Sequence, residues 1–195
     1  SGEIKLFNET ISNKNNFFNP KILKEKGLAH VPEDRQRMGL VTDFKAHENL
    51  IFGYHHQEPF SKSSILKEKE ILSFSKKVME EYDVRPRSPN LITSNFSGGN
   101  QQKIILSREL NENPKVLLVG QPTRGVDIGA IEFIHQRLID MRDKGAAILL
   151  VSVELEEVLS LSDRIVVMFD GNIVGEKINK NVTDRELGLL MAGVA

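Results

Sequence analysis

Two short apolar runs on either side of a helical pattern are the feature of this sequence that most constrains its fold. Residues 115–120 (KVLLVG) and 147–152 (AILLVS) are apolar without alternation, which is typical of strands buried on both faces of a parallel sheet. Between them apolar residues recur at helical spacing over 127–143, with Asp127 as a good N-cap and Gly145 beyond the end. The three segments predict a βαβ unit, and therefore an α/β fold with a mostly parallel sheet.

Further strand-like runs lie towards both ends of the chain, and Asp170-Gly171 predicts a hairpin between the last two of them. These runs are 3–7, 28–31, 164–169 and 172–177.

The middle of the chain has a helical pattern, which is clearest over residues 65–82 and follows several serines that favour a helix start. We therefore expect residues 1–43 and 114–195 to form one α/β core. Residues 44–113 are expected to form a helical subdomain inserted into that core.

The composition excludes several classes of partner and site. The 26 Lys+Arg and 27 Asp+Glu residues leave a net charge of -1, which provides no global attraction to nucleic acid or anionic lipid. There is no cysteine, so the cytoplasm is the expected compartment, and His55-His56 lacks a further ligand at a metal-binding spacing. The longest apolar run, residues 146–151, is far short of the roughly 20 residues that span a bilayer. Any membrane role is expected to go through a partner.

The stretch NFSGGNQQK, residues 95–103, predicts a site for an anion. Ser97, Gly98 and Gly99 precede a helical pattern, and glycines at a helix start allow another group to approach the backbone N–H donors and the positive helix end. Phosphate is the natural candidate. The alternative is that Ser97 is an ordinary N-cap and that the glycines belong to a loop.

The motifs around this stretch, in their order along the chain, resemble those of ATP-binding cassette (ABC) ATPases. NFSGGNQQK, the strand KVLLV and QPTRGVDIGA are similar to the signature helix, the Walker B strand and the D-loop. GLAHVPEDRQRMGLV is similar to the Q-loop segment, and LLVSVELEEVLSLSDRIVVMFDGNIV is similar to the segment around the switch histidine. VPEDR, GGNQQK and PTRGVDIGA resemble the C-terminal cassette of tandem subunits in importers of simple sugars and nucleosides, with the nucleoside branch resembled most.

The resemblance implies a P-loop, G-x-x-x-x-G-K-[ST], which this sequence does not contain. The spacings Gly120 to Gly125 and Gly188 to Gly193 occur, but Val-Asp and Val-Ala follow them. The P-loop of the family lies upstream of the Q-loop segment, so we expect this chain to begin downstream of that loop. The implied fold is a partial P-loop NTPase core, and the chain is expected to be a fragment of a longer polypeptide.

Several positions depart from the family's own ATP site. Gly120 and Gln121 stand where the Walker B strand ends in Asp-Glu, and an amide at Gln121 could position water but could not accept its proton. Val153 stands at the switch-histidine position, and Glu33 stands at the Q-loop glutamine. We expect a degenerate site and no ATPase activity from this chain alone.

The signature side of a composite site is retained. In the family, the signature of one cassette closes on ATP held by the P-loop of another. The residues that keep this capacity are Ser97, Gly98, Gly99, Asn100 and, through a further hydrogen bond, Gln101. Asp127 matches the D-loop aspartate, and a plain N-cap role for it carries equal weight. ATP and Mg²⁺ are therefore expected in the assembled subunit only.

The resemblance implies a function in import. The chain would be the C-terminal part of the ATP-binding subunit of an ABC importer for nucleosides or simple sugars. Its partners would be the preceding cassette of the same polypeptide, the transmembrane permease and indirectly a solute-binding protein, at the cytoplasmic face of the plasma membrane. Residues 47–53 (HENLIFG) would either face the permease or serve plain helical packing. The alternatives are a non-transport ABC protein that acts on ribosomes or DNA, and a non-hydrolysing structural pseudo-cassette.

Overall fold

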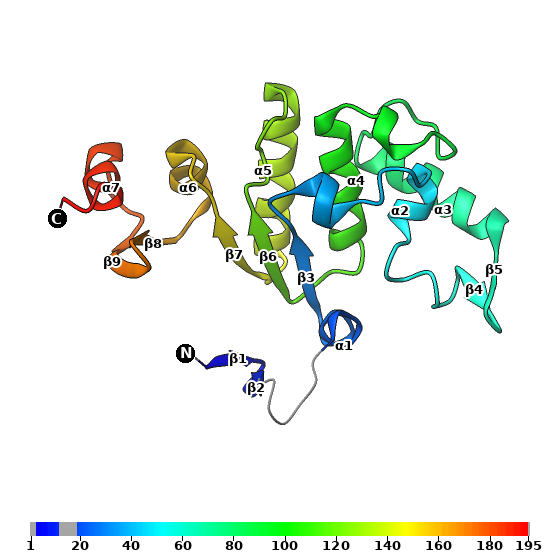
Figure 1. Cartoon of the computed structure of the whole chain (residues 1–195), viewed down its shortest axis with the longest axis horizontal. Helices are drawn as coiled ribbons and strands as arrows, with labels where there is room; N and C mark the ends of the chain where they lie inside the picture. Colours follow the sequence, from blue (N-terminus) through cyan, green and yellow to red (C-terminus); the bar gives the residue numbers. More distant parts are fainter. Residues whose placement is uncertain (1–2, 12–18, 195) are drawn as a thin grey trace.

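The computed structural model describes residues 3–11 and 19–194, and a three-stranded parallel sheet lies at its centre (Figure 1). The strands, in spatial order, are β3 (Leu28–Val31), β6 (Val116–Gly120) and β7 (Ala147–Val151). Helix α5 (Ile128–Asp143) connects β6 to β7, and the side chain of Asp127 caps its first turn. The predicted βαβ unit and the α/β class are therefore confirmed.

One face of this sheet carries the main core. Val31 is 0% exposed and Leu117 is 0% exposed on that face, which packs against α4 (Gly98–Leu110) and α5. On the other face Leu149 and Val151 of β7 are each 60% exposed. The expectation that both strands of the βαβ unit are buried on both faces is wrong for β7. Within the described part of the chain, α4 and α5 cover only one face of the sheet. The side chains of β7 therefore alternate between half-buried and exposed.

The segment 44–113 is largely helical, and Figure 1 shows most of it at one end of the molecule. Its elements are α2 (Ala46–Leu50), β4 (Ser61–Lys62), β5 (Ile65–Leu66), α3 (Glu68–Glu81), η2 (Thr93–Asn95) and α4. Because α4 packs against β3 and α5, this segment shares the main core with the sheet. The division into core and inserted subdomain stays a prediction.

The predicted helix over 65–82 begins later than expected. Ser63 and Ser64 adopt φ values of 51° and 66°, which turn the chain back on itself instead of starting a helix. Ile65 and Leu66 consequently pair with β4. The helix α3 starts only at Glu68.

The N-terminal part contains more regular structure than the sequence predicted. β1 (Ile4–Leu6) pairs with β2 (Glu9–Ile11) in an antiparallel hairpin, and α1 (Pro20–Glu25) precedes β3. Residues 12–18, between β2 and α1, lie outside the described residues. A π-helical turn, η1 (Arg35–Gly39), follows β3.

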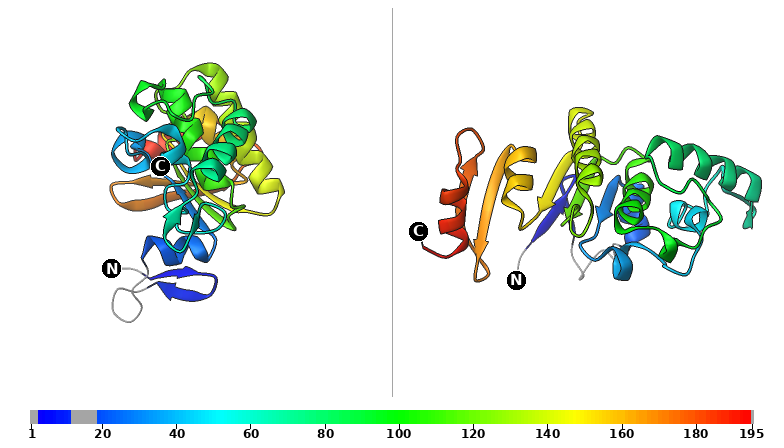
Figure 2. Two further views of the ribbon diagram at one scale, coloured as in Figure 1. Left: turned by 90° about the vertical axis from the view of Figure 1, so that its right-hand side faces the viewer. Right: turned by 90° about the horizontal axis from the view of Figure 1, so that it is seen from above.

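The C-terminal hairpin is confirmed. β8 (Arg164–Phe169) pairs with β9 (Asn172–Ile178), and Asp170 and Gly171 turn the chain with φ values of 46° and 74°. The helices α6 (Leu155–Leu161) and α7 (Asp184–Met191) pack with the hairpin in a second apolar cluster at the opposite end from the helical segment (Figure 2). None of the helices in the described ranges combines the length and apolarity that crossing a membrane requires.

Candidate functional site

Ser97 stands at the start of α4, where its exposed side chain caps the helix by accepting a hydrogen bond from the backbone N of Asn100. The helix behind it is buried along most of its length, and Ile104, Ile105 and Leu106 are each 0% exposed. The first N–H groups of a helix have no partner inside that helix. The packing therefore fixes the helix start with Ser97 exposed, Gly98 half-buried and Gly99 buried.

The two glycines allow a close approach between the start of α4 and the loop after β6. A Cβ atom at Gly98 would lie 2.6 Å from Nη2 of Arg35 and 3.0 Å from the backbone oxygen of Gly125. A Cβ atom at Gly99 would lie 3.0 Å from Oδ2 of Asp127. The structure thus brings Asp127 beside Gly99, although the two residues are far apart in the sequence. Its Oδ1 atom also caps α5 through the backbone N of Ala130, at 3.0 Å.

Arg35 is a residue of this site to which the sequence analysis assigned no role. From η1, its guanidinium donates hydrogen bonds to the backbone oxygens of Arg124, at 2.6 Å, and Gly125, at 3.3 Å. It therefore links the Q-loop segment to the loop 121–127 beside Gly98. Its place in the VPEDR motif was visible in the sequence, but its partners were not.

Three of the four altered positions follow the carboxyl ends of three neighbouring strands. Glu33 follows β3, Gln121 follows β6 and Val153 follows β7, so they share one edge of the sheet. Glu33 is exposed and pairs with Arg124 at 2.9 Å. Such an exposed pair contributes little to stability.

Gln121 is held by its backbone. Its φ is 47°, and its N–H donates to the backbone oxygen of Val151 at 2.8 Å. Its amide side chain is neutral and has no lone pair basic enough to take a proton from water. Val153 is 62% exposed and offers no polar side-chain atom.

A buried polar cluster under the loop 121–127 also escaped the sequence analysis. Glu157 on α6 has a side chain that is 3% exposed, and its Oε1 accepts a hydrogen bond of 2.9 Å from Oγ1 of Thr123. Nε2 of His135 on α5 lies 3.1 Å from the same oxygen. The cluster fastens the loop to two helices. No spacing in the sequence distinguishes Glu157 from its neighbour Glu156.

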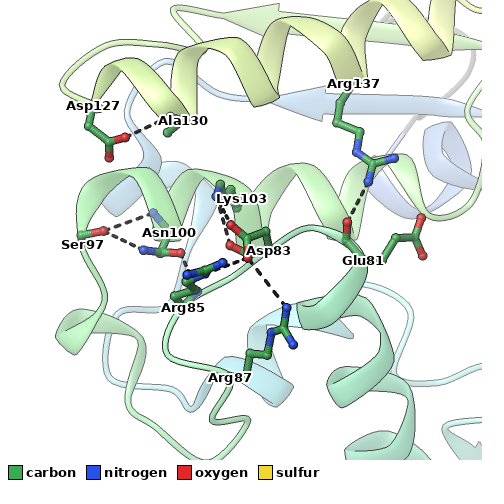
Figure 3. A network of polar contacts seen from close by, with 10 residues as sticks. All are labelled: Glu81, Asp83, Arg85, Arg87, Ser97, Asn100, Lys103, Asp127, Ala130 and Arg137. Carbon is green, nitrogen blue, oxygen red and sulfur yellow. Dashed lines mark hydrogen bonds and ion pairs between the residues drawn. The ribbon is translucent and has the colours of Figure 1, made fainter.

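The side chains of Gln101 and Asn100 both have partners within the chain. Gln101 is 2% exposed, and its amide contacts the backbone oxygen of Thr93 and the amide of Gln36 at 3.2 and 3.3 Å. The further hydrogen bond expected of it towards a ligand therefore has no support from its position. Asn100 is half-buried and contacts both Ser97 and the backbone of Arg85 (Figure 3).

Comparison with solved structures identifies the architecture. The chain superposes on a nucleotide-free ATP-binding cassette of an ABC transporter with a TM-score of 0.72 and 25% identity, over 98% of this chain and 74% of that chain. A dimeric cassette, MJ0796 bound to ADP and Pi in a post-hydrolysis state, matches with a TM-score of 0.71 and 23% identity over 93% of this chain and 75% of that one. The chain has the fold of an ATP-binding cassette.

Curated relatives of this chain are named as ATP-binding proteins of import systems. The nucleoside import ATP-binding protein NupA of Lactococcus lactis subsp. cremoris is 47% identical over 99% of the chain, which covers 37% of that relative. The guanosine import ATP-binding protein NupO of Bacillus subtilis is 44% identical over the same shares. The ribose import protein RbsA of Oceanobacillus iheyensis is 34% identical over 95% of the chain and 36% of its own length. The chain therefore spans little more than a third of these relatives. No protein-family model matches it.

The cassette has a groove of about 900 Å³ beside the Q-loop segment. It lies among α1, β3, η1, the segment after α2 and the carboxyl end of α4, and its lining is mainly apolar. The charged side chains that line it are Lys21, Lys24, Arg37, Arg108 and Glu109. Lys24 pairs with the buried Glu109 at 2.6 Å on one wall.

Over residues 3–11 and 19–194, no group of three or more His, Asp or Glu side chains is arranged to hold an ion. The expectation that any Mg²⁺ belongs to the assembled subunit remains a prediction.

Proposed function

We propose that the chain is the C-terminal part of the ATP-binding subunit of an ABC importer for nucleosides or simple sugars. It supplies the signature side of a composite ATP site, and a preceding cassette of the same polypeptide supplies the P-loop. The names of the relatives support the importer, and they do not favour an ABC protein that acts on ribosomes or DNA. The observation that carries the role in ATP binding is the exposed Ser97 at the start of the buried helix α4, with Asp127 beside Gly99.

The residues at the start of α4 fit a phosphate group. They present a hydroxyl and helix N-terminal N–H donors, and the positive end of the helix favours an anion. Asp127, which matches the D-loop aspartate of the family, lies beside Gly99. ATP would supply the phosphoanhydride whose cleavage drives transport, while Ser97, Gly98 and Gly99 bind and orient its phosphate from the side opposite the P-loop.

The chain's own half-site is proposed to be degenerate. Gln121 can orient water by hydrogen bonding, but it cannot remove a proton, and Val153 has no polar side-chain atom that could contact a phosphate oxygen. Glu33 would place a negative charge near an anionic ligand. These three positions share one edge of the sheet, so their changes act on one site.

The groove is proposed to receive the permease. Within residues 47–53, Asn49, Leu50 and Ile51 are buried, which supports packing for that half of the segment. Phe52 is 47% exposed and lines the groove, which supports partner contact for the other half. We therefore place the chain at the cytoplasmic face of the membrane, with the permease as its partner and a solute-binding protein as an indirect one.

Calorimetric titration of Mg-ATP tests the composite site. The chain alone should show no binding heat, and the complete subunit should bind ATP more weakly when Ser97→Ala is introduced. Ser94→Ala is the matched control, since Ser94 is an exposed serine three positions earlier that caps no helix. Micromolar binding by the chain alone, or equal effects of the two variants, would refute the proposal.

The degenerate half-site needs a separate test in the complete subunit. Gln121→Glu restores a proton acceptor next to the strand end and should raise ATP turnover if this half-site can still hold nucleotide. Unchanged transport-linked turnover would instead favour a scaffold role for this half-site.

A further inference from the structure

The orientation of the Asn100 amide is determined by the backbone of Arg85. The backbone N of Arg85 lies 2.6 Å from Oδ1 of Asn100. A backbone N–H can only donate, so the side-chain atom that faces it must be the oxygen. The amide nitrogen of Asn100 is thereby directed to Ser97, with Nδ2 at 2.9 Å from Oγ.

The hydroxyl of Ser97 consequently receives two N–H groups. The backbone N of Asn100 lies 3.5 Å from Oγ, and Nδ2 of the same residue is the second donor. A serine hydroxyl has two acceptor lone pairs and one O–H donor. With both lone pairs engaged, the proton is left to point away from the helix, and Ser97 is exposed. This geometry suits a ligand atom that accepts a hydrogen bond.

Two helices, α4 and α5, hold the segment that orients Asn100. From α4, Nζ of Lys103 donates to the backbone oxygen of Asp83 at 3.0 Å. Nε of Arg85 contacts Oδ1 of the same aspartate at 2.8 Å. From α5, Arg137 donates to the backbone oxygen of Glu81 at the end of α3, at 2.7 Å. Figure 3 shows the contact of Arg137 with Glu81 and, separately, the contacts that lead from Lys103 through Asp83, Arg85 and Asn100 to Ser97.

We propose that Asn100 is a positioning residue that acts through Ser97 and does not itself contact the ligand. Anchored by the backbone N–H of Arg85, it turns the Ser97 hydroxyl outward as a donor to a phosphate oxygen. The inference rests on the proposed role of Ser97 in binding ATP. It assigns to the segment 81–87 the task of keeping that donor in place.

The isosteric variant Asn100→Asp separates this role from a direct contact. A carboxylate still accepts from the Arg85 N–H, but it presents an acceptor to Ser97, whose proton then turns inward. In the complete subunit, Asn100→Asp should weaken Mg-ATP binding about tenfold, the loss expected for one hydrogen bond to a charged group. Asn95→Asp is the control for the added charge, because Asn95 is an exposed residue close to Ser97 in the chain.

A double-mutant cycle decides between the two roles. In a Ser97→Ala background, Asn100→Asp should weaken binding no more than Asn95→Asp does. A full effect of Asn100→Asp in that background would overturn the inference, as would no effect in the natural background. If Ser97→Ala leaves ATP binding unchanged, the proposed function of this site fails together with the inference. Thermal unfolding of each variant shows whether it is folded.

A measurement without nucleotide tests the geometry itself. In the complete subunit, Ser97→Ala should shift the side-chain amide resonances of Asn100, because Nδ2 loses its acceptor. The amide of Gln136, which bonds to Asp140 on the surface of α5 at 2.8 Å, is the internal control and should not shift. Unshifted Asn100 resonances would show that the hydrogen bond to Ser97 is absent, and the inference would be wrong.

Discussion

Nη1 of Arg35 donates a 2.6 Å hydrogen bond to the backbone oxygen of Arg124, a residue 89 positions further along the chain. The same guanidinium reaches Gly125 and lies against Gly98. One side chain thus joins the segment after β3, the loop after β6 and the start of α4. The three segments that bear most of the proposed site depend on this contact for their relative positions.

Replacing Arg35 with alanine should lower the free energy of unfolding by about 2 kcal/mol, since hydrogen bonds from a charged donor to two carbonyls are lost. The free energy of unfolding of Arg35→Lys should lie between those of the natural chain and of Arg35→Ala. An ammonium group lacks the planar fork of a guanidinium, so it cannot bond to both oxygens in the same way. Urea denaturation measures both variants. Arg37→Ala, an exposed arginine in the same turn, should change stability by no more than about 0.5 kcal/mol. Equal losses for Arg35→Ala and Arg37→Ala would contradict the role of Arg35.

Asn49 joins the two ends of the segment before the signature. It is 0% exposed, bonds to both backbone groups of Val41 at 2.9 and 2.8 Å, and donates to Oγ1 of Thr93 at 2.9 Å. Asn49→Ala should cost about 3 kcal/mol, because buried polar groups are left without partners. The exposed Asn90 is the control, and Asn90→Ala should be nearly neutral by the same denaturation measurement. A loss below about 1 kcal/mol at Asn49 would show that water replaces the amide.

The two tyrosines of the chain should resist ionisation in the folded protein. Burial raises the pKa of Tyr82 to about 12, and burial also raises the pKa of Tyr54 above its ordinary value. Because the folded state holds these protons more tightly, the stabilisation is complete below pH 10 and is lost as the pH rises towards 12. An ultraviolet titration should therefore show little tyrosinate at pH 10 until the chain unfolds. A full tyrosinate signal at that pH in folded protein would contradict the burial.

Asp83 should make stability depend on acid pH. The hydrogen bond from the Arg85 side chain lowers the pKa of its carboxyl below the ordinary 3.8, and the charge of Lys103 acts in the same direction. The folded state favours the ionised form, so the stabilisation is present above that pH and is lost as the pH falls through the folded-state pKa. Denaturation at several pH values should show a lower free energy of unfolding for Asp83→Asn than for the natural chain, and this difference should disappear in acid. A difference that stays constant would assign the effect to packing instead.

Much of the local structure could be predicted from short stretches of sequence. Asp127 caps α5 as expected, and Ser97 caps α4 as the alternative interpretation of its stretch predicted, because a cap depends only on the next three residues. Asp170-Gly171 makes its hairpin for a similarly local reason. The prediction of a helix start at Ser63 and Ser64 was wrong, because serine is also common in turns. The pairing of Ile65 and Leu66 with β4 decided the conformation there.

The candidate site was predictable only in part. Its motifs predicted Ser97, the two glycines and Asp127, but no periodicity could show that Asp127 lies against Gly99. The burial of Glu157 could not be predicted from the sequence. The pattern along α6 shows which residues share a helix face, but the partners of Glu157 are Thr123 in the loop after β6 and His135 on α5. The exposure of one face of β7 could not be predicted either, because an apolar run does not show whether helices cover one face or both faces of its strand.

The sequence by itself determined the βαβ unit and the helix caps, because these depend on periodicity and on contacts within a few residues. The tertiary structure alone decided that Arg35 reaches Arg124, that Glu157 holds Thr123, and that the backbone of Arg85 orients Asn100. These contacts join positions from different elements. The first two form when the helices pack on the sheet and bring the loops at its edge within hydrogen-bonding distance, and the third forms when α3 packs against α4.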